Sequence, residues 1–162
     1  MEVAGHRIHL EGGSHTDRSG GLNILEAICL VQGEAHSDRP TGVCPVLGEF
    51  AYWINMSPFL DQIELDEYVY PLLRELQGSC SPTSEKARAE CLVRGAEALG
   101  DVKPRYLRVA KERLAAGDYQ GAACFAGRVM FTEVDDTQEN DSERREALDE
   151  FVRILRAAKG RV

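Results

Sequence analysis

No stretch of this sequence approaches the ~20 consecutive apolar residues that a membrane-spanning helix needs. Residues 1–13 also lack the charged-then-apolar pattern of a secretory signal, and instead hold two histidines and a glycine pair. These two absences predict a soluble protein of the cytoplasm with no membrane partner.

Catalytic signatures are equally scarce. The sequence has no CxxC pair, no glycine-rich phosphate loop, no G-x-S-x-G and no H-E-x-x-H. It also lacks the alternation of strand and helix patterns that a dinucleotide-binding fold requires. The common enzyme classes are therefore unsupported, and the balance favours a protein without enzymatic activity.

Cysteine is present, but not in the pattern of a disulfide framework. The five cysteines are an odd number and lie far apart in a chain too long for a small disulfide scaffold. Cys29, Cys91 and Cys124 fall inside apolar helical runs, where a cysteine is usually a small buried hydrophobic residue.

Basic residues are outnumbered, with 19 Lys and Arg against 27 Asp and Glu and a formal charge of −8. Nucleic-acid binders take most of their affinity from phosphate neutralisation, so an acidic chain without a basic patch argues against that partner. The locally basic stretch 103–113 is better explained as the solvated face of a helix.

What the sequence does contain is helical periodicity. Its 162 residues, 43% of them hydrophobic, fit one domain over residues 1–162. The predicted fold class is all-α: an irregular bundle of about six to seven helices behind an irregular N-terminal segment, residues 1–20. We expect an acidic linker at 132–141. The helices are expected at about 22–32, 45–55, 59–76, 82–99, 104–116, 119–131 and 142–159.

Segment 15–55 concentrates the residues that could carry chemistry. They are His15, Glu26, Glu34, His36, Asp38 and Cys44. Zinc or another divalent metal could be held by His36, Asp38 and Cys44, because imidazole, carboxylate and thiolate are its usual ligands. The same set could instead perform acid–base or thiol chemistry.

A purely structural interpretation of this segment stays open. Asp38 could form a turn before Pro40, His36 could bond a helix end, and Cys44 could be a buried cap before helix 45–55. Glu26 has two alternatives as well, because it interrupts an otherwise apolar helix. It either lies exposed on a narrow polar stripe with Asn23, or is buried and paired.

Three runs in this segment, G-L-N-I-L-E-A (21–27), G-E-A-H-S-D-R-P (33–40) and C-P-V-L (44–47), resemble a group of uncharacterised bacterial and phage proteins. That group carries G-x-C-x-M-E-A, then A-G-E-x-x-S-D-x-P, then one or two cysteines before a P-[VA]-[IL] helix. The resemblance implies no activity. Asn23 and Gly42 stand where the group has cysteines, so a thiolate metal site would have lost ligands here, whereas a structural motif would tolerate both changes.

Three functions follow from these patterns. The first is a small binding or interaction protein of unknown partner, including self-association, and it predicts an exposed apolar patch, for instance on helix 142–159. The second is a metal-dependent or acid–base enzyme at the His36/Asp38 segment, which predicts side chains converging in one pocket. The third is a nucleic-acid-associated regulator.

Overall fold

A computed structural model describes residues 2–3, 5–13, 15–16, 21–56, 60–99, 104–136 and 140–161. Two strands of two residues form an antiparallel hairpin before the first helix. The elements are β1 (Glu2–Val3), β2 (His6–Arg7), α1 (Ile24–Val31), α2 (Pro45–Ile54), α3 (Gln62–Glu64), η1 (Leu65–Val69), α4 (Tyr70–Glu75), η2 (Pro82–Ser84), α5 (Glu85–Glu97), α6 (Pro104–Ala115), α7 (Tyr119–Asp136) and α8 (Asp141–Lys159).

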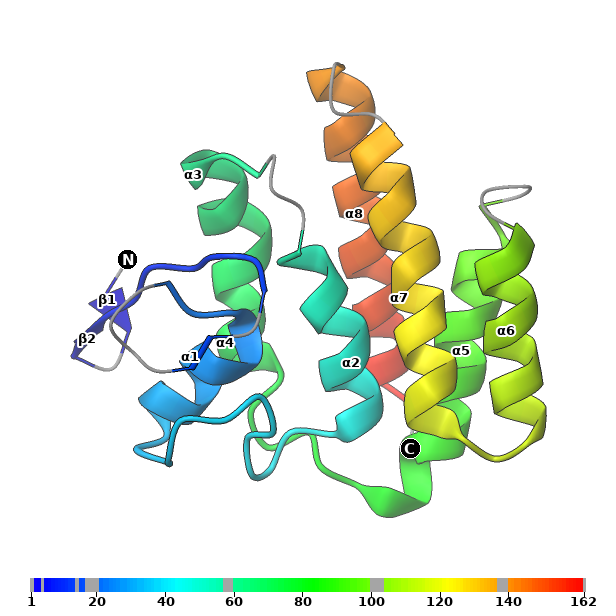
Figure 1. Cartoon of the computed structure of the whole chain (residues 1–162), viewed down its shortest axis with the longest axis horizontal. Coiled ribbons are helices and arrows are strands. Elements are labelled where there is room, and N and C mark those ends of the chain that lie inside the picture. The colour runs from blue at the N-terminus through cyan, green and yellow to red at the C-terminus, as the bar shows by residue number, and fades with distance from the viewer. Residues whose placement is uncertain are drawn as a thin grey trace.

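These helices confirm the all-α class and form one core. The long helices α5, α6, α7 and α8 lie side by side, while α1, α3 and α4 form a second group with the N-terminal segment (Figure 1). Helix α2 runs between the two groups and contacts α1, α5, α7 and α8. It is central to the core, since Val46, Leu47 and Phe50 are fully buried.

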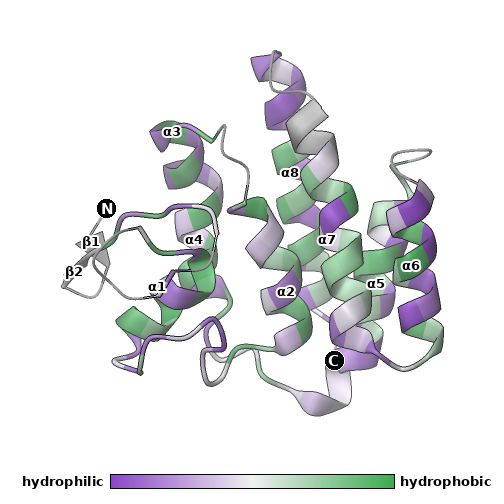
Figure 2. Ribbon diagram, in the orientation of Figure 1, coloured by the Kyte–Doolittle hydropathy of each residue, from purple (hydrophilic) through white to green (hydrophobic). Residues whose placement is uncertain are grey.

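Close packing around α7 depends on small residues. Ala122, Ala123 and Ala126 are fully buried on α7. A Cβ on Gly127 would lie only 2.6 Å from Cδ1 of Trp53, so the ring of α2 rests directly on the α7 backbone. The hydrophilic residues gather on outward faces such as that of α6 (Figure 2).

The helix expected at 59–76 contains Pro71, and the structure accommodates this proline with a π-helical turn just before it. Residues 62–75 continue as one helix through α3, η1 and α4, and the Tyr70 N–H reaches back five residues to the Leu65 carbonyl. Proline has no backbone N–H to donate to the preceding turn, and the wider π turn accommodates this missing hydrogen bond. Glu64 just before this turn is buried and accepts a 2.7 Å bond from Arg144 of α8, which ties the two groups of helices together.

Two details of the helical ends differ from the sequence prediction. The expected linker 132–141 is wrong in its first part, because α7 continues to Asp136; no Pro or Gly interrupts the backbone there, and acidic residues are compatible with a helix. Residues 137–139 and the predicted break at 57–58 lie outside the described residues. α8 then begins at Asp141 with Asn140 as its cap.

None of the helices in the described ranges combines the length and the apolar character needed to cross a bilayer. The apolar residues of α8 face inward: Leu148, Phe151, Val152 and Leu155 are all buried. Helix α8 therefore packs on the bundle and does not present the apolar patch that a partner would need.

Candidate functional site

The first turn of α1 is built around the Glu26 carboxylate. Asn23 caps the helix by accepting N–H bonds from Leu25 and Glu26, and Glu26 accepts the Asn23 N–H in return. This reciprocal capping box turns the Glu26 side chain back toward the chain that precedes the helix. Glu26 and Asn23 are only 2% and 0% exposed, so the buried and paired alternative for Glu26 is confirmed.

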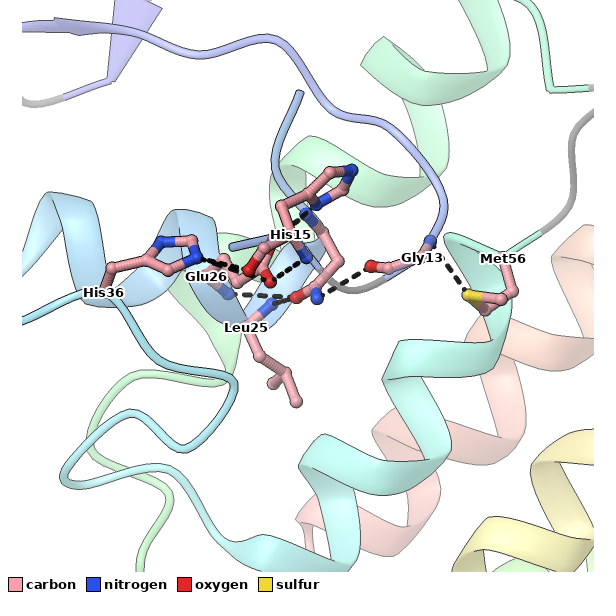
Figure 3. Close-up of polar contacts among 7 residues, drawn as sticks. Gly13, His15, Leu25, Glu26, His36 and Met56 are labelled. Atoms are coloured by element: carbon pink, nitrogen blue, oxygen red, sulfur yellow. Dashed lines mark hydrogen bonds and ion pairs between the residues drawn. The ribbon is translucent and has the colours of Figure 1, made fainter. Parts of the chain in front are cut away.

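His15 closes on the same carboxylate from the N-terminal segment (Figure 3). Its backbone N–H donates to Glu26 Oε1 at 2.8 Å, and its ring Nδ1 lies 2.7 Å from Oε2. Burial raises the pKa of Glu26, but the bonds from the His15 and Asn23 backbone and from the His15 ring outweigh it and hold that pKa below its ordinary value of 4.5. Glu26 is therefore an ionised, buried acceptor.

This contact fixes the orientation of the His15 ring. Because a carboxylate can only accept, Nδ1 must carry the proton that it shares with Glu26. In the neutral ring Nε2 then keeps its lone pair, and Figure 3 shows that nitrogen on the ring edge turned away from Glu26. A carboxylate-backed imidazole of this kind is suited to accept a hydrogen bond or a proton, or to ligate a metal.

His36 approaches the same carboxylate from the connector between α1 and α2, residues 32–44. Its Nε2 lies 2.8 Å from the His15 carbonyl oxygen and 3.7 Å from Glu26 Oε1. The carbonyl requires Nε2 to be the donor, so His36 helps to hold the His15 backbone in place. Its Nδ1 is buried and has no hydrogen-bond partner within the described residues.

Further bonds anchor the chain leading to His15. The Asn23 side-chain amide donates to the Gly13 carbonyl at 2.9 Å, and the Gly13 N–H meets the sulfur of Met56 at 3.1 Å (Figure 3). Tyr70 of α4 donates its hydroxyl to the Ile8 carbonyl at 3.1 Å. The irregular N-terminal segment is thus held by hydrogen bonds to the first turn and cap of α1, to Met56 just after α2, and to α4.

The structure brings together three of the six predicted site residues: His15, Glu26 and His36. The other three lie elsewhere. Glu34 is half-buried and accepts the Thr41 N–H, and Asp38 is exposed on the connector. Cys44 is fully buried as the N-cap of α2, with its own N–H donated to Ser79 Oγ at 3.0 Å.

The predicted metal set of His36, Asp38 and Cys44 therefore does not form a cluster. Throughout the described parts of the chain, no three His, Cys, Asp or Glu side chains are arranged to hold a metal ion. Glu26 already accepts three N–H groups, and His36 Nε2 faces a carbonyl. Among His15, Glu26 and His36, the atom best suited to ligate a metal is Nε2 of His15, which makes no hydrogen bond to the described residues.

A groove that none of these three residues lines lies between the connector and α2. Its volume is about 420 Å3, within the range of small-molecule sites. Leu25 and Val43 form part of an apolar floor, and a Cβ on Gly48 would lie 3.3 Å from Leu25. The full lining is Leu25, Asp38, Arg39, Pro40, Val43, Pro45, Gly48, Glu49, Tyr52 and Gln120.

Sequence reasoning missed several of these residues. The N-x-x-E spacing of Asn23 and Glu26 is a capping-box pattern and could have been recognised in the sequence. Gln120 could not have been found, because only the packing of α7 on α2 brings it to 2.8 Å from Glu49. Tyr52 has no distinguishing sequence pattern either. Gly42 has a φ of +79°, a backbone conformation that favours glycine, so this residue is suited to its turn.

In the basic stretch 103–113, of which the structure describes residues 104–113, three cations form ion pairs within the protein. Arg108 pairs with Glu112, Lys111 with Glu97, and Arg113 with Asp118. These cations are neutralised within the protein, as expected for a solvated helix face. Comparisons of the chain with protein-family models, with curated proteins and with solved structures gave no match.

Proposed function

We propose that this chain is a small-molecule binding domain whose ligand occupies the groove between the connector and α2. The observation that carries this proposal is the 420 Å3 cavity itself, with an apolar floor and a polar rim. Such a combination is typical of ligand sites, in which apolar surface supplies affinity and a few polar groups fix orientation.

The lining defines the ligand that would fit. A flat or aliphatic body would pack on Leu25 and Val43 against the Tyr52 ring, while polar substituents would reach Arg39 or the Glu49–Gln120 pair. Since the rim carries both signs of charge, the ligand is expected to be polar at one end and to carry little net charge.

A protein partner is a weaker explanation of a binding role. Among the residues that the structure describes, Ile63 is the only large hydrophobic side chain that is well exposed, at 62%. Helix α8, the expected docking helix, buries its apolar residues in the bundle. A stable protein interface would need a larger apolar patch, which supports a small ligand in the groove instead.

A fragment screen would test this proposal. The library would contain aromatic acids, amines and neutral amides, with binding followed by the fluorescence of Trp53, the only tryptophan, whose ring lies 5.8 Å from that of Tyr52. Gly48→Ala adds a methyl group to the groove floor and should weaken every groove ligand. Gly160→Ala, at the far end of α8, is the matched control and should bind normally. Hits that bind both variants equally well would reject the groove as the site.

A second candidate function is acid–base chemistry at His15. The specific observation in its favour is the Nδ1–Glu26 contact at 2.7 Å, which leaves Nε2 free to accept a proton. This arrangement matches the oriented imidazole of hydrolytic triads, without an identified nucleophile.

Hydrolysis of p-nitrophenyl acetate, which reports accessible and basic imidazoles, would test this second function. His15→Ala should remove most of the activity, and Glu26→Gln should lower it because the ring loses its orientation. His9→Ala is the control, since His9 is exposed. Equal losses in the His9 and His15 variants would show that His15 is an ordinary surface histidine.

A further inference from the structure

A second cavity, separate from the groove, lies where the N-terminal segment crosses the end of α2. Its volume is about 390 Å3. Its apolar walls come from Leu10, Leu60 and Leu65, and its polar part comes from Glu11, the glycines 12 and 13, and Asn55 with Met56. His15, Glu26 and His36 do not line this cavity, although Gly13 and Met56, which anchor the chain before His15, do.

Asn55 is the unusual residue of this cavity. It follows the last turn of α2 and is only 2% exposed. Its side-chain oxygen is buried and accepts no hydrogen bond from the described residues. Buried polar atoms are nearly always paired in folded proteins, so an unpaired acceptor on a residue that lines a cavity points to a donor supplied by a ligand.

The surroundings of Asn55 also favour a hydrogen-bond donor with positive charge. A Cβ on Gly12 would lie 3.1 Å from the Asn55 carbonyl oxygen and 3.3 Å from that of Met56, so both carbonyls face this crossing. They belong to the C-terminal end of α2, which carries the negative end of the helix dipole. Glu11 is the one ionisable side chain among the described lining residues, and it is an acid.

We propose that this cavity binds a primary ammonium group carried on a short aliphatic chain. The ammonium donates to Asn55 Oδ1 and to the carbonyls at the end of α2, with Glu11, which lines the same cavity, supplying the opposite charge. The aliphatic chain packs against Leu10, Leu60 and Leu65. A net charge of −8 favours the approach of such a cation.

Titration with n-butylammonium chloride, followed by amide chemical shifts, tests the proposal directly. We expect saturable shifts at residues 10–13 and 55–56, with a Kd on the order of 1 mM for so small a ligand. n-Butanol has the same chain without the charge and should shift these amides far less. Equal binding of the alcohol, or no saturable shift from the ammonium, would overturn the proposal.

Two variants separate the charge from the fold. Glu11→Gln changes an exposed residue and should weaken butylammonium binding about two- to fivefold, as expected for loss of one exposed charge pair. Glu146→Gln removes the same charge from the exposed face of α8 and should leave the affinity unchanged. Equal losses in both variants would reduce the effect to general electrostatics and reject the site.

The ammonium group could come from a lysine side chain of another protein or from a free amine, and a pair of ligands distinguishes these two sources. Nα-acetyl-lysine N-methylamide mimics a lysine side chain within a protein, whereas butylammonium mimics a free amine. Binding of both supports the cavity as a site for a partner's lysine, and binding of butylammonium alone supports it as a site for a free amine. Binding of neither overturns the proposal.

Discussion

The N-terminal region, residues 5–44, and the bundle of α5 to α8 are stabilised in different ways. In the N-terminal region, one buried carboxylate, Glu26, accepts bonds from His15 and Asn23 and holds an irregular chain against α1. In the bundle, most buried residues are apolar or small, with Arg88 and Arg144 as charged exceptions, and many of the ion pairs lie on the surface, such as Arg108–Glu112. Directional hydrogen bonds therefore dominate in one region, and apolar packing dominates in the other.

This difference matters for function because a hydrogen bond fixes both the orientation of a reactive ring and the nitrogen that carries its proton, whereas packing fixes the orientation alone. The His15 ring has one tautomer and one direction because Glu26 fixes both. Helix α2, which packs against the bundle, supplies a wall of both the groove and the second cavity. Substitutions can perturb each region separately. The loss in the free energy of unfolding, and the number of residues affected, should differ between the two regions.

The largest effect is expected from removing a ring at the centre of the bundle. Phe151 of α8 is fully buried, with its centroid 4.7 Å from that of Phe50 on α2. Phe151→Ala should lower the free energy of unfolding by about 3–5 kcal/mol, because a large cavity replaces the ring. Urea denaturation followed by circular dichroism measures this loss. A loss below about 1 kcal/mol would show that the core rearranges, contrary to the packing description.

A smaller and more local effect is expected from Glu26→Gln. The amide nitrogen of Gln would face N–H donors, leaving buried donors unpaired at a cost of about 2–3 kcal/mol. Amide hydrogen exchange should accelerate at residues 21–28, whereas the near-ultraviolet signal of Trp53, which packs on α7, should not change. Glu146→Gln serves as a control and should alter neither. Loss of the Trp53 signal would show that the two regions unfold together.

The pH dependence of the same residue sharpens the comparison. The pKa of Glu26 is lowered in the folded protein, so its stabilising bonds are fully present above the ordinary value of 4.5 and are lost as the pH falls through the folded pKa. The stability difference between wild type and Glu26→Gln should therefore be largest near neutral pH and shrink below pH 4.5. Urea midpoints measured at decreasing pH would reveal this convergence. A constant difference would contradict an ionised Glu26.

The sequence predicted the bundle better than the polar cluster for the same physical reason. Apolar periodicity is written into the chain locally, so helices such as 45–55 and 104–116 were expected within a residue or two of their observed ends. The meeting of His15, Glu26 and His36 depends on the path of an irregular segment, which no local pattern encodes. That path alone decides which of the six predicted site residues meet in the folded protein.

The smallest effect should come from a surface ion pair of the bundle. Arg108 and Glu112 lie one turn apart on α6, with side chains 65% and 58% exposed. Glu112→Gln should change the free energy of unfolding by no more than about 0.5 kcal/mol, and this change should disappear in high salt because solvent and ions screen the pair. Thermal unfolding in low and high salt measures both quantities. Because Glu26→Gln removes the same charge but breaks buried bonds, its larger loss should persist in high salt. A similar salt sensitivity in both variants would mean that the Glu26 bonds act through charge alone, without the directional role that distinguishes the N-terminal region from the bundle.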